Sequence, residues 1–185
     1  MRELSLSVLD IAQNSISAGA DLTKISVITD TAADRLTVTI EDNGCGMTPE
    51  QVRNVTDPFF TTRTTRRVGM GVPLFKLAAE QTGGSLSISS EVGKGTVTSA
   101  CFVPSHVDMT PVGDMNSTIA VLIRLNPTID FIYEYGIDGR SFTLDTRELR
   151  EQLGDVPLNN EDVLAWIAEY LTENTDDIKN GGNIE

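Results

Sequence analysis

Two segments with two glycines each, one after a predicted strand and the other at the start of a predicted helix, constrain the fold of this chain most strongly. Residues 41–47 read Glu-Asp-Asn-Gly-Cys-Gly-Met and follow an alternating run typical of a strand, whereas residues 68–74 read Val-Gly-Met-Gly-Val-Pro-Leu and open a helical run. Glycines allow a backbone to approach another group closely, and a helix start presents free N–H groups. Between the two segments, residues 57–67 are rich in hydroxyl and guanidinium side chains. The fold must therefore bring a strand end, a polar loop and a helix start around one space, which is typical of a nucleotide pocket.

The charge of the chain excludes some classes of partner. The 185 residues carry a formal net charge of -13, and a chain of this length forms one ordinary domain with at most a small addition. Residues 1–104 hold 9 basic and 11 acidic side chains, whereas residues 105–185 hold 5 basic and 16 acidic ones. Because such a surface repels anionic polymers and anionic membranes, we expect neither nucleic acid nor membrane as a partner.

The cysteines and the N-terminus indicate the compartment. Cys45 and Cys101 occur in unrelated contexts and predict neither a metal pair nor a disulfide framework. The N-terminus lacks the apolar core of a signal peptide, and no run of about 18 apolar residues occurs. We expect a cytoplasmic protein.

Hydrophobic periodicity predicts the elements of the first 104 residues. They are helices over 4–18, 48–55 and 71–81, and strands over 23–30, 35–41, 85–90 and 96–103. The helical stripes consist of Leu4, Val8, Ile11, Ala12 and Ser15 in the first helix, and of Leu74, Leu77, Ala78 and Gln81 in the third. In the last strand, Val97, Ala100 and Phe102 are expected to face the core together. This order predicts an α+β fold, a two-layer α/β sandwich with helices on one face of a largely antiparallel sheet.

The remaining residues predict a smaller unit of α-β-β-α type. After a connector, a helix over 117–125 capped by Ser117 precedes a hairpin over 129–137 and 140–145, turned by Asp138-Gly139. Helices over 146–153 and 160–171 follow, and the polar tail from Thr172 is expected to be frayed. The predicted organisation is a domain at 1–104, a connector at 105–116, an acidic helix-hairpin-helix appendage at 117–174 and a flexible tail at 175–185.

Five motifs in order resemble those of the ATP-binding fold shared by gyrase, the heat-shock chaperone ATPase, histidine kinases and MutL, known as GHKL. They are Leu9-Asp10-Ile11-Ala12-Gln13-Asn14-Ser15, Asp42-Asn43-Gly44-Cys45-Gly46, Asp57-Pro58-Phe59-Phe60-Thr61-Thr62, Gly69-Met70-Gly71-Val72-Pro73-Leu74-Phe75-Lys76, and Gly93-Lys94-Gly95-Thr96. The resemblance covers residues 4–104. It implies the histidine-kinase-like ATPase fold, with a mixed, mostly antiparallel sheet, and it implies ATP and Mg²⁺ as ligands.

The resemblance also implies a role for each motif. Asp42 would accept a hydrogen bond from the adenine amine, Thr96 would brace it through a water, and Asn14 would offer an oxygen to Mg²⁺. The helix that starts at Gly71 would face the phosphates. The implied ATP-binding residues are Asn14, Asp42, Gly44, Gly46, Met47, Phe60, Thr61, Thr62, Arg63, Arg66, Arg67, Gly69, Met70, Gly71, Val72, Leu74, Lys76 and Thr96, with Asn14 also a metal ligand.

The candidate catalytic residue departs from the family pattern. Hydrolytic members place Glu four residues before the magnesium Asn, and Asp10, shorter by one methylene, stands there in this chain. It could act as a general base with reduced reach. By helical spacing alone, Asp10 and Asn14 could equally form a solvated polar face.

The function expected from the resemblance is a kinase that acts on a separate protein. Only nine residues precede Asp10, so the sequence offers no phosphoacceptor hairpin before it, and the single histidine, His106, is expected to be a surface residue of the connector. We therefore expect a stand-alone protein kinase in bacterial regulation. It would act on serine, threonine or histidine of a separate partner, as anti-sigma-factor serine kinases do.

Two alternatives stay open for the activity. One is an ATP-gated switch with slow hydrolysis, and the other is a non-catalytic ATP-binding regulatory module. The acidic appendage is expected to dock an unidentified protein partner or a second copy of the chain.

Overall fold

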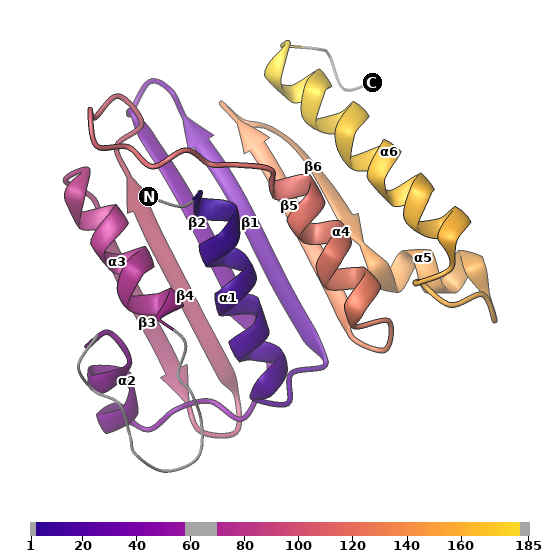
Figure 1. Ribbon diagram of the computed structural model, residues 1–185, viewed down its shortest axis with the longest axis horizontal. Helices are drawn as coiled ribbons and strands as arrows, with labels where there is room; N and C mark the ends of the chain where they lie inside the picture. Colours follow the sequence, from indigo (N-terminus) through magenta and orange to yellow (C-terminus); the bar gives the residue numbers. More distant parts are fainter. Residues whose placement is uncertain (1–2, 58–69, 182–185) are drawn as a thin grey trace.

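The computed structural model describes residues 3–57 and 70–181 (Figure 1). The helices are α1 (Leu4–Ser17), α2 (Pro49–Val55), α3 (Gly71–Gln81), α4 (Met115–Leu125), α5 (Thr146–Leu153) and α6 (Glu161–Lys179). The strands are β1 (Leu22–Asp30), β2 (Arg35–Asp42), β3 (Ser85–Glu91), β4 (Gly95–Phe102), β5 (Asp130–Ile137) and β6 (Arg140–Asp145).

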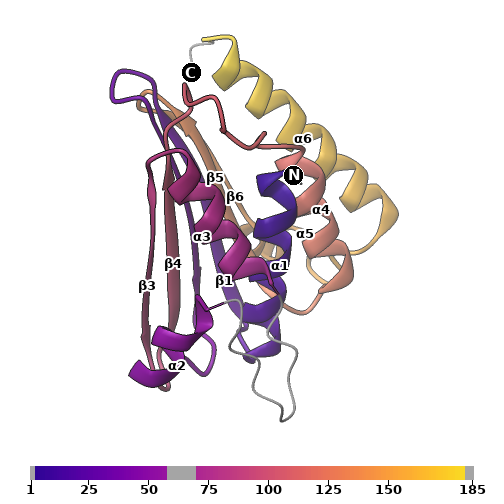
Figure 2. The same ribbon diagram turned by 60° about the vertical axis from the view of Figure 1, so that its left-hand side comes forward.

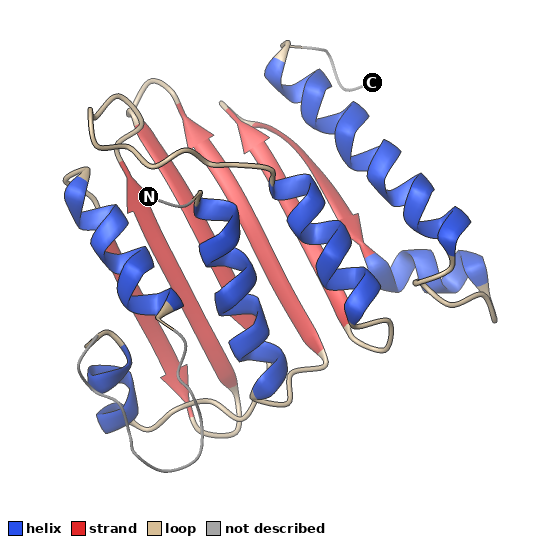
Figure 3. Cartoon of the chain, viewed as in Figure 1, coloured by secondary structure: helices blue, strands red, loops and turns tan. Residues whose placement is uncertain are grey.

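The strands form one mixed sheet in the order β3-β4-β2-β1-β5-β6. β1 and β5 run parallel, and the other neighbouring strands are antiparallel. Figure 2 shows the sheet nearly edge-on with the helices gathered on one side of it, and Figure 3 shows α1, α3 and α4 in front of the strands. The predicted two-layer α/β sandwich with a mixed, mostly antiparallel sheet is confirmed.

Helix α1 packs on the centre of the sheet through the apolar stripe predicted for it. Leu4, Val8, Ile11, Ala12 and Ser15 are all buried. Its first free N–H groups are satisfied from a distant part of the chain, because the N–H groups of residues 4 and 5 donate to the carbonyls of residues 111 and 112, at 2.9 Å each. The connector is therefore bound to the start of α1.

Two predicted core faces are wrong. In β4, residue 97 lies on the opposite face of the strand from residues 98, 100 and 102, so Val97 is 36% exposed and Thr98 is buried in its place. In α3, Leu74 and Leu77 are exposed, and the core side presents Val72, Phe75 and Ala79 as well as the predicted Ala78. In both elements, apolar residues occur on each of the two faces, so the sequence pattern alone did not identify the buried face.

The C-terminal hairpin extends the same sheet. β5 lies alongside β1 from Leu22↔Asp130 to Thr29↔Ile137. α4 packs beside α1 and α6 over this part of the sheet (Figure 1). The residues predicted to form an appendage thus share a layer and a core with residues 4–102.

Two further details of this half differ from the prediction. Helix α4 starts at Met115, not at residue 117, and its cap is Asp114, whose carboxylate accepts from the N–H of Ser117 at 2.9 Å. Helix α6 continues to Lys179, so the expected frayed tail from Thr172 and the flexible tail from 175 are wrong over this range. The helix continues because Thr175 and Ile178 extend its buried stripe.

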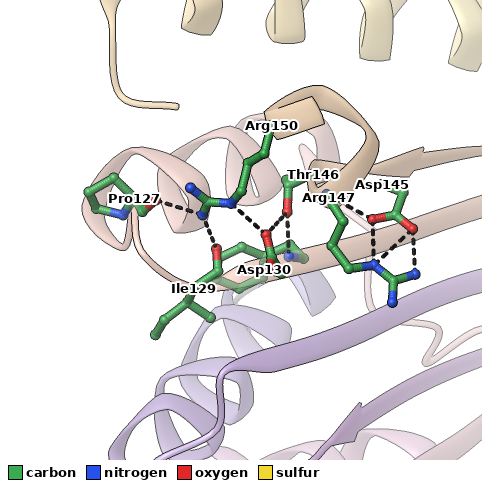
Figure 4. Close-up of polar contacts among 8 residues, drawn as sticks. Pro127, Ile129, Asp130, Asp145, Thr146, Arg147 and Arg150 are labelled. Atoms are coloured by element: carbon green, nitrogen blue, oxygen red, sulfur yellow. Dashed lines mark hydrogen bonds and ion pairs between the residues drawn. The ribbon is translucent and has the colours of Figure 1, made fainter. Parts of the chain in front are cut away.

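An arginine ties α5 to the start of β5 (Figure 4). Arg150 donates from Nε to Asp130 Oδ1 at 2.7 Å, and its terminal nitrogen donates to the carbonyls of Pro127 and Ile129 at 2.6 and 3.1 Å. The hydroxyl of Thr146 also donates to Asp130, at 3.0 Å. This network orders the turn that leads from α4 into the parallel strand β5.

Within residues 3–57 and 70–181, no helix combines the length and the apolar character needed to cross a lipid bilayer.

Candidate functional site

A cavity of about 590 Å³ lies at the C-terminal end of α1, among α1, α2, the start of α3 and the neighbouring ends of β2, β3 and β4. Its apolar wall consists of Ile11, Ala18, Met47, Val55, Val72 and Ile88. Its polar wall consists of Asn14, Ser15, Ser17, Asp42, Cys45, Gln51, Thr96 and Thr98, together with the backbone of Gly46. The volume lies within the range of small-molecule sites, and among the described residues Asp42 supplies the single carboxylate of the wall.

Asp42 is the last residue of β2, and two donors fix its carboxylate. The hydroxyl of Ser15 donates to Oδ2 at 2.6 Å, and the N–H of Gly44 donates to Oδ1 at 2.9 Å. A carboxylate held in this way keeps its orientation and has remaining lone pairs for a ligand donor. Ser15 was not predicted as a site residue. The available signal was a hydroxyl on the buried stripe of α1, since a buried polar group requires a partner.

The loop after Asp42 is fastened to the β3–β4 turn. The N–H of Gly93 donates to the Cys45 carbonyl at 2.8 Å, and the N–H of Met47 donates to the Ser90 hydroxyl at 2.8 Å. Gly46 has a φ of +68°, and a Cβ placed on it would lie 2.0 Å from the Glu91 carbonyl oxygen. Only glycine permits this approach, and it brings the backbone of the loop into the cavity wall.

Thr96 stands directly opposite Asp42 in the β2–β4 pairing. Its hydroxyl lies 2.8 Å from that of Ser90, which in turn donates to the Gly95 carbonyl at 2.9 Å. The predicted neighbourhood of residues 42 and 96 is thus present, and both line the cavity. The bridge through a water stays a prediction.

The two polar residues predicted on α1 occupy different places. Asn14 lines the cavity, whereas Asp10 is exposed, is not part of the wall and lies against the start of α3. A Cβ placed on Gly71 would lie 2.8 Å from the Cβ of Asp10, so α1 and α3 approach closely at this point. Within the described residues, no side chain caps α3, which leaves its first N–H groups available to a ligand.

The other predicted residues divide into three groups. Gly44 stabilises Asp42, and Gly46, Met47 and Val72 contribute to the wall. Met70, Leu74 and Lys76 lie on or just before α3 without lining the cavity, and Lys76 faces Glu80 at 3.9 Å. Phe60, Thr61, Thr62, Arg63, Arg66, Arg67 and Gly69 lie outside the described residues.

The donor set suits a magnesium ion that is held mainly by a ligand. In the described part of the chain, no group of three or more His, Cys, Asp or Glu side chains could hold a metal. Mg²⁺ needs few protein ligands when phosphate oxygens and waters complete its octahedron. The Asn14 side chain makes no hydrogen bond to another described residue and lines the cavity, so its oxygen fits this role.

Comparison with known proteins gives one family. Residues 2–106 match the family described as histidine kinase-, DNA gyrase B- and HSP90-like ATPase. The sensor histidine kinase ZraS of Salmonella typhimurium is 33% identical over 95 residues, which cover 51% of this chain and 20% of ZraS. Sporulation kinase C of Bacillus subtilis is 28% identical over 95 residues, which cover 51% of this chain and 22% of that kinase. The chain thus matches only about a fifth of the length of these relatives.

A solved structure shares the fold. The crystal structure of the N-terminal domain of a DNA repair protein superposes with a TM-score of 0.54 at 16% sequence identity. The superposition covers 78% of this chain, which is more than the family match covers, and 53% of that chain.

Proposed function

The chain belongs to the family of histidine kinase-, DNA gyrase B- and HSP90-like ATPases, its residues 2–106 are homologous to the ATPase domains of histidine kinases, and we propose that its cavity binds ATP with Mg²⁺. The observation that carries this proposal is the Asp42 carboxylate, held by Ser15 and Gly44 in a cavity that also has an apolar wall. An adenine ring presents an exocyclic amine to such an acceptor and flat apolar faces to the wall. A guanine ring would place a carbonyl oxygen against the carboxylate, which disfavours it.

The phosphates would extend from this base pocket toward the start of α3. Its free N–H groups and its partial positive charge favour an anion there. Asn14, one helical turn before the end of α1, would hold Mg²⁺. When bound, the ion neutralises charge on the phosphate oxygens.

We further propose that the chain is a protein kinase that transfers the γ-phosphoryl group to a hydroxyl or imidazole of a separate partner. Phosphoryl transfer requires mainly positioning and charge neutralisation, so few protein groups suffice. Asp10 lies beside the start of α3, where its carboxylate can orient an incoming acceptor group. The only histidine of the sequence, His106, is exposed in the loop after β4, and its Nδ1 accepts from the N–H of Asp108 at 3.1 Å.

An ATP-gated switch is the second candidate, and the contact between α1 and α3 favours it. Asp10 packs on Gly71, the first residue of the helix that follows residues 58–69. A nucleotide bound against the start of α3 would change this contact, and hydrolysis by the short Asp10 side chain would be slow. A non-catalytic ATP-binding module is the third candidate.

Calorimetric titration with ATP, ADP and GTP in the presence of Mg²⁺ tests the binding proposal. We expect ATP and ADP to bind and GTP to bind at least tenfold more weakly. Asp42→Asn should reduce ATP affinity at least tenfold, since a hydrogen bond to a charged group contributes about 1.5–3 kcal/mol. Glu41→Gln is the matched control, because Glu41 neighbours Asp42 on β2 but is exposed and pairs with Lys24 at 3.5 Å. Equal affinities of the two variants would refute the adenine assignment.

Incubation with γ-labelled ATP and extract from the source organism separates the three activities. Label on another polypeptide that disappears with Asn14→Ala supports the kinase. Free phosphate in the absence of extract that disappears with Asp10→Asn supports the switch. Binding without either product leaves the non-catalytic module.

A further inference from the structure

Helix α6 lies at the β6 edge of the sheet, and one side of it is turned away from the rest of the protein (Figure 1). Its buried residues pack on β5, β6 and α4. The helical spacing of about 100° per residue places six exposed residues on the opposite side. These residues, named here the outer stripe, are Asp162, Trp166, Glu169, Glu173, Asp176 and Asp177.

The tryptophan of the outer stripe is exposed but held in place. Trp166 is 47% exposed, and its indole stacks on the ring of Tyr170, with the ring centroids 5.1 Å apart and an angle of 20° between the planes. Tyr170 is in turn fixed to β6, because its ring contacts Phe142 edge-on at 6.0 Å and its hydroxyl donates to the Thr143 carbonyl at 3.3 Å. An ordered aromatic side chain that stays open to solvent is typical of the anchors of protein–protein contacts.

The five carboxylates of the outer stripe have no cation to neutralise them. Within the described residues, none of these side chains forms an ion pair or a hydrogen bond. Glu173 stands four residues from both Glu169 and Asp177, a spacing at which like charges on a helix repel each other. Asp176 and Asp177 lie in the last turn, where the negative end of the helix dipole disfavours them. A positively charged partner along the stripe would relieve both effects.

The stripe favours arginine over other cations. In the described part of the chain, no group of three or more His, Cys, Asp or Glu side chains could hold a metal ion. A second copy packed on α6 about a two-fold axis would set carboxylate against carboxylate. A planar guanidinium group stacks on an aromatic ring and also pairs with a carboxylate. Arginines about one helical turn apart would match the spacing of Trp166, Glu169 and Glu173.

We propose that the outer stripe of α6 docks an arginine-rich segment of a separate protein, with one guanidinium group on the indole of Trp166 and others paired with Glu169 and Glu173. Among the described residues that line the candidate ATP cavity, none belongs to α6, so this contact is independent of the proposed nucleotide site.

Trp166 is the only tryptophan of the sequence, so its fluorescence reports on the stripe directly. The probe is a peptide of about 12 residues with arginines and alanines at helical spacing, long enough as a helix to follow the stripe from Asp162 to Glu173. A peptide with glutamine in place of each arginine is its uncharged counterpart. We expect saturable changes of Trp166 emission with the arginine peptide, at a dissociation constant on the order of 100 μM in low salt, and none with the glutamine peptide. Raising NaCl to about 0.5 M should weaken binding at least fivefold.

Fluorescence anisotropy of the labelled arginine peptide compares variants without relying on the tryptophan. Trp166→Ala should weaken binding about two- to fivefold, and circular dichroism checks that it stays folded. Glu169→Gln/Glu173→Gln should weaken binding about three- to tenfold. Glu41→Gln/Glu50→Gln is the matched control, because it removes the same number of charges from β2 and α2, away from α6 (Figure 1). It should leave binding nearly unchanged.

Equal losses in the two double variants would overturn the proposal, since net charge alone would then attract the peptide. So would equal binding of the arginine and glutamine peptides, or unchanged binding by Trp166→Ala. If Trp166 emission changed with protein concentration in the absence of peptide, the stripe would be a contact with a second copy of the chain, and the proposal would likewise be wrong.

Discussion

At the scale of single residues, the orientation of the Asp42 carboxylate depends on Ser15. This hydroxyl donates to Asp42 at 2.6 Å from a buried position on α1. Ser15→Ala should lower ATP affinity about five- to tenfold, because it removes one of the two hydrogen bonds that orient the carboxylate but keeps the carboxylate itself, and a typical hydrogen bond contributes on the order of 1 kcal/mol. Calorimetric titration with ATP·Mg²⁺ measures this.

Ser17→Ala provides the matched control. Ser17 also lies on α1 and lines the same cavity, but it is exposed and makes no hydrogen bond to Asp42. Equal losses in both variants would show that the effect comes from a polar wall in general and not from the fixed carboxylate.

The sequence predicted Asp42 but not its partner, for a physical reason. Asp42 stands at the end of a strand and is followed by Gly44 and Gly46. This pattern involves only neighbouring residues, so the position of the Asp42 carboxylate can be predicted from the strand alone. The contact of Ser15 with Asp42 depends on how α1 sits across β2, which is set by the packing of the whole apolar stripe. The pattern therefore placed Ser15 on the core face without indicating its partner.

At the scale of elements, the loop after β2 and the β3–β4 turn form one unit through Gly46. Gly46→Ala would place a Cβ 2.0 Å from the Glu91 carbonyl oxygen, so the turn must move. Gly93→Ala is the matched control, since Gly93 has a similarly positive φ of +83° but open space around its Cα. Urea unfolding should show Gly46→Ala less stable than Gly93→Ala by about 2 kcal/mol or more. Equal losses would mean that only the positive φ matters.

The C-terminal part of α6 is a packed element. Ile178 is fully buried, so Ile178→Ala should destabilise the protein by about 2–4 kcal/mol in chemical unfolding. Asp177→Ala, at the exposed neighbouring position, should change stability by less than about 0.5 kcal/mol. If Ile178→Ala left the free energy of unfolding unchanged, this end of the helix would be frayed in solution.

Element types were easier to predict than their faces and ends. Strong local signals, such as the Thr48-Pro49 helix start and the Asp138-Gly139 turn, are present as predicted, because they depend only on neighbouring residues. Val97 was assigned to the core although strand alternation places it opposite Ala100. The end of α6 was missed because its polar composition hides one buried stripe, which is recognisable only when the sheet beneath it is known.

At the scale of the whole molecule, Asp138 joins the two halves of the chain. It lies in the β5–β6 turn and accepts from the N–H and the hydroxyl of Thr31, each at 2.7 Å, in the turn that follows β1. These bonds lower the pKa of Asp138, with the Thr31 hydroxyl as the largest cause. Hydrogen bonds likewise lower the pKa of Asp114, chiefly from Ser117, and of Asp145, chiefly from Arg147. All three carboxyl groups belong to the acidic part from 105 onward.

A lowered native pKa fixes the sign of the pH dependence. The unfolded carboxyl titrates near about 3.9, so the stabilisation is present above that pH and is lost as the pH falls through the lower native pKa. We therefore expect the wild type to be more stable than Asp138→Asn at neutral pH, and the difference to shrink as the pH falls below about 3.9. Asparagine also tolerates the positive φ of 52° at this position, so the turn itself is retained. Asp155→Asn is the control, because Asp155 is exposed and its side chain makes no hydrogen bond in the described structure. Urea unfolding of the three proteins from pH 7 to pH 2 measures the effect, and a difference that stayed constant over this range would assign it to the turn backbone and not to the charge.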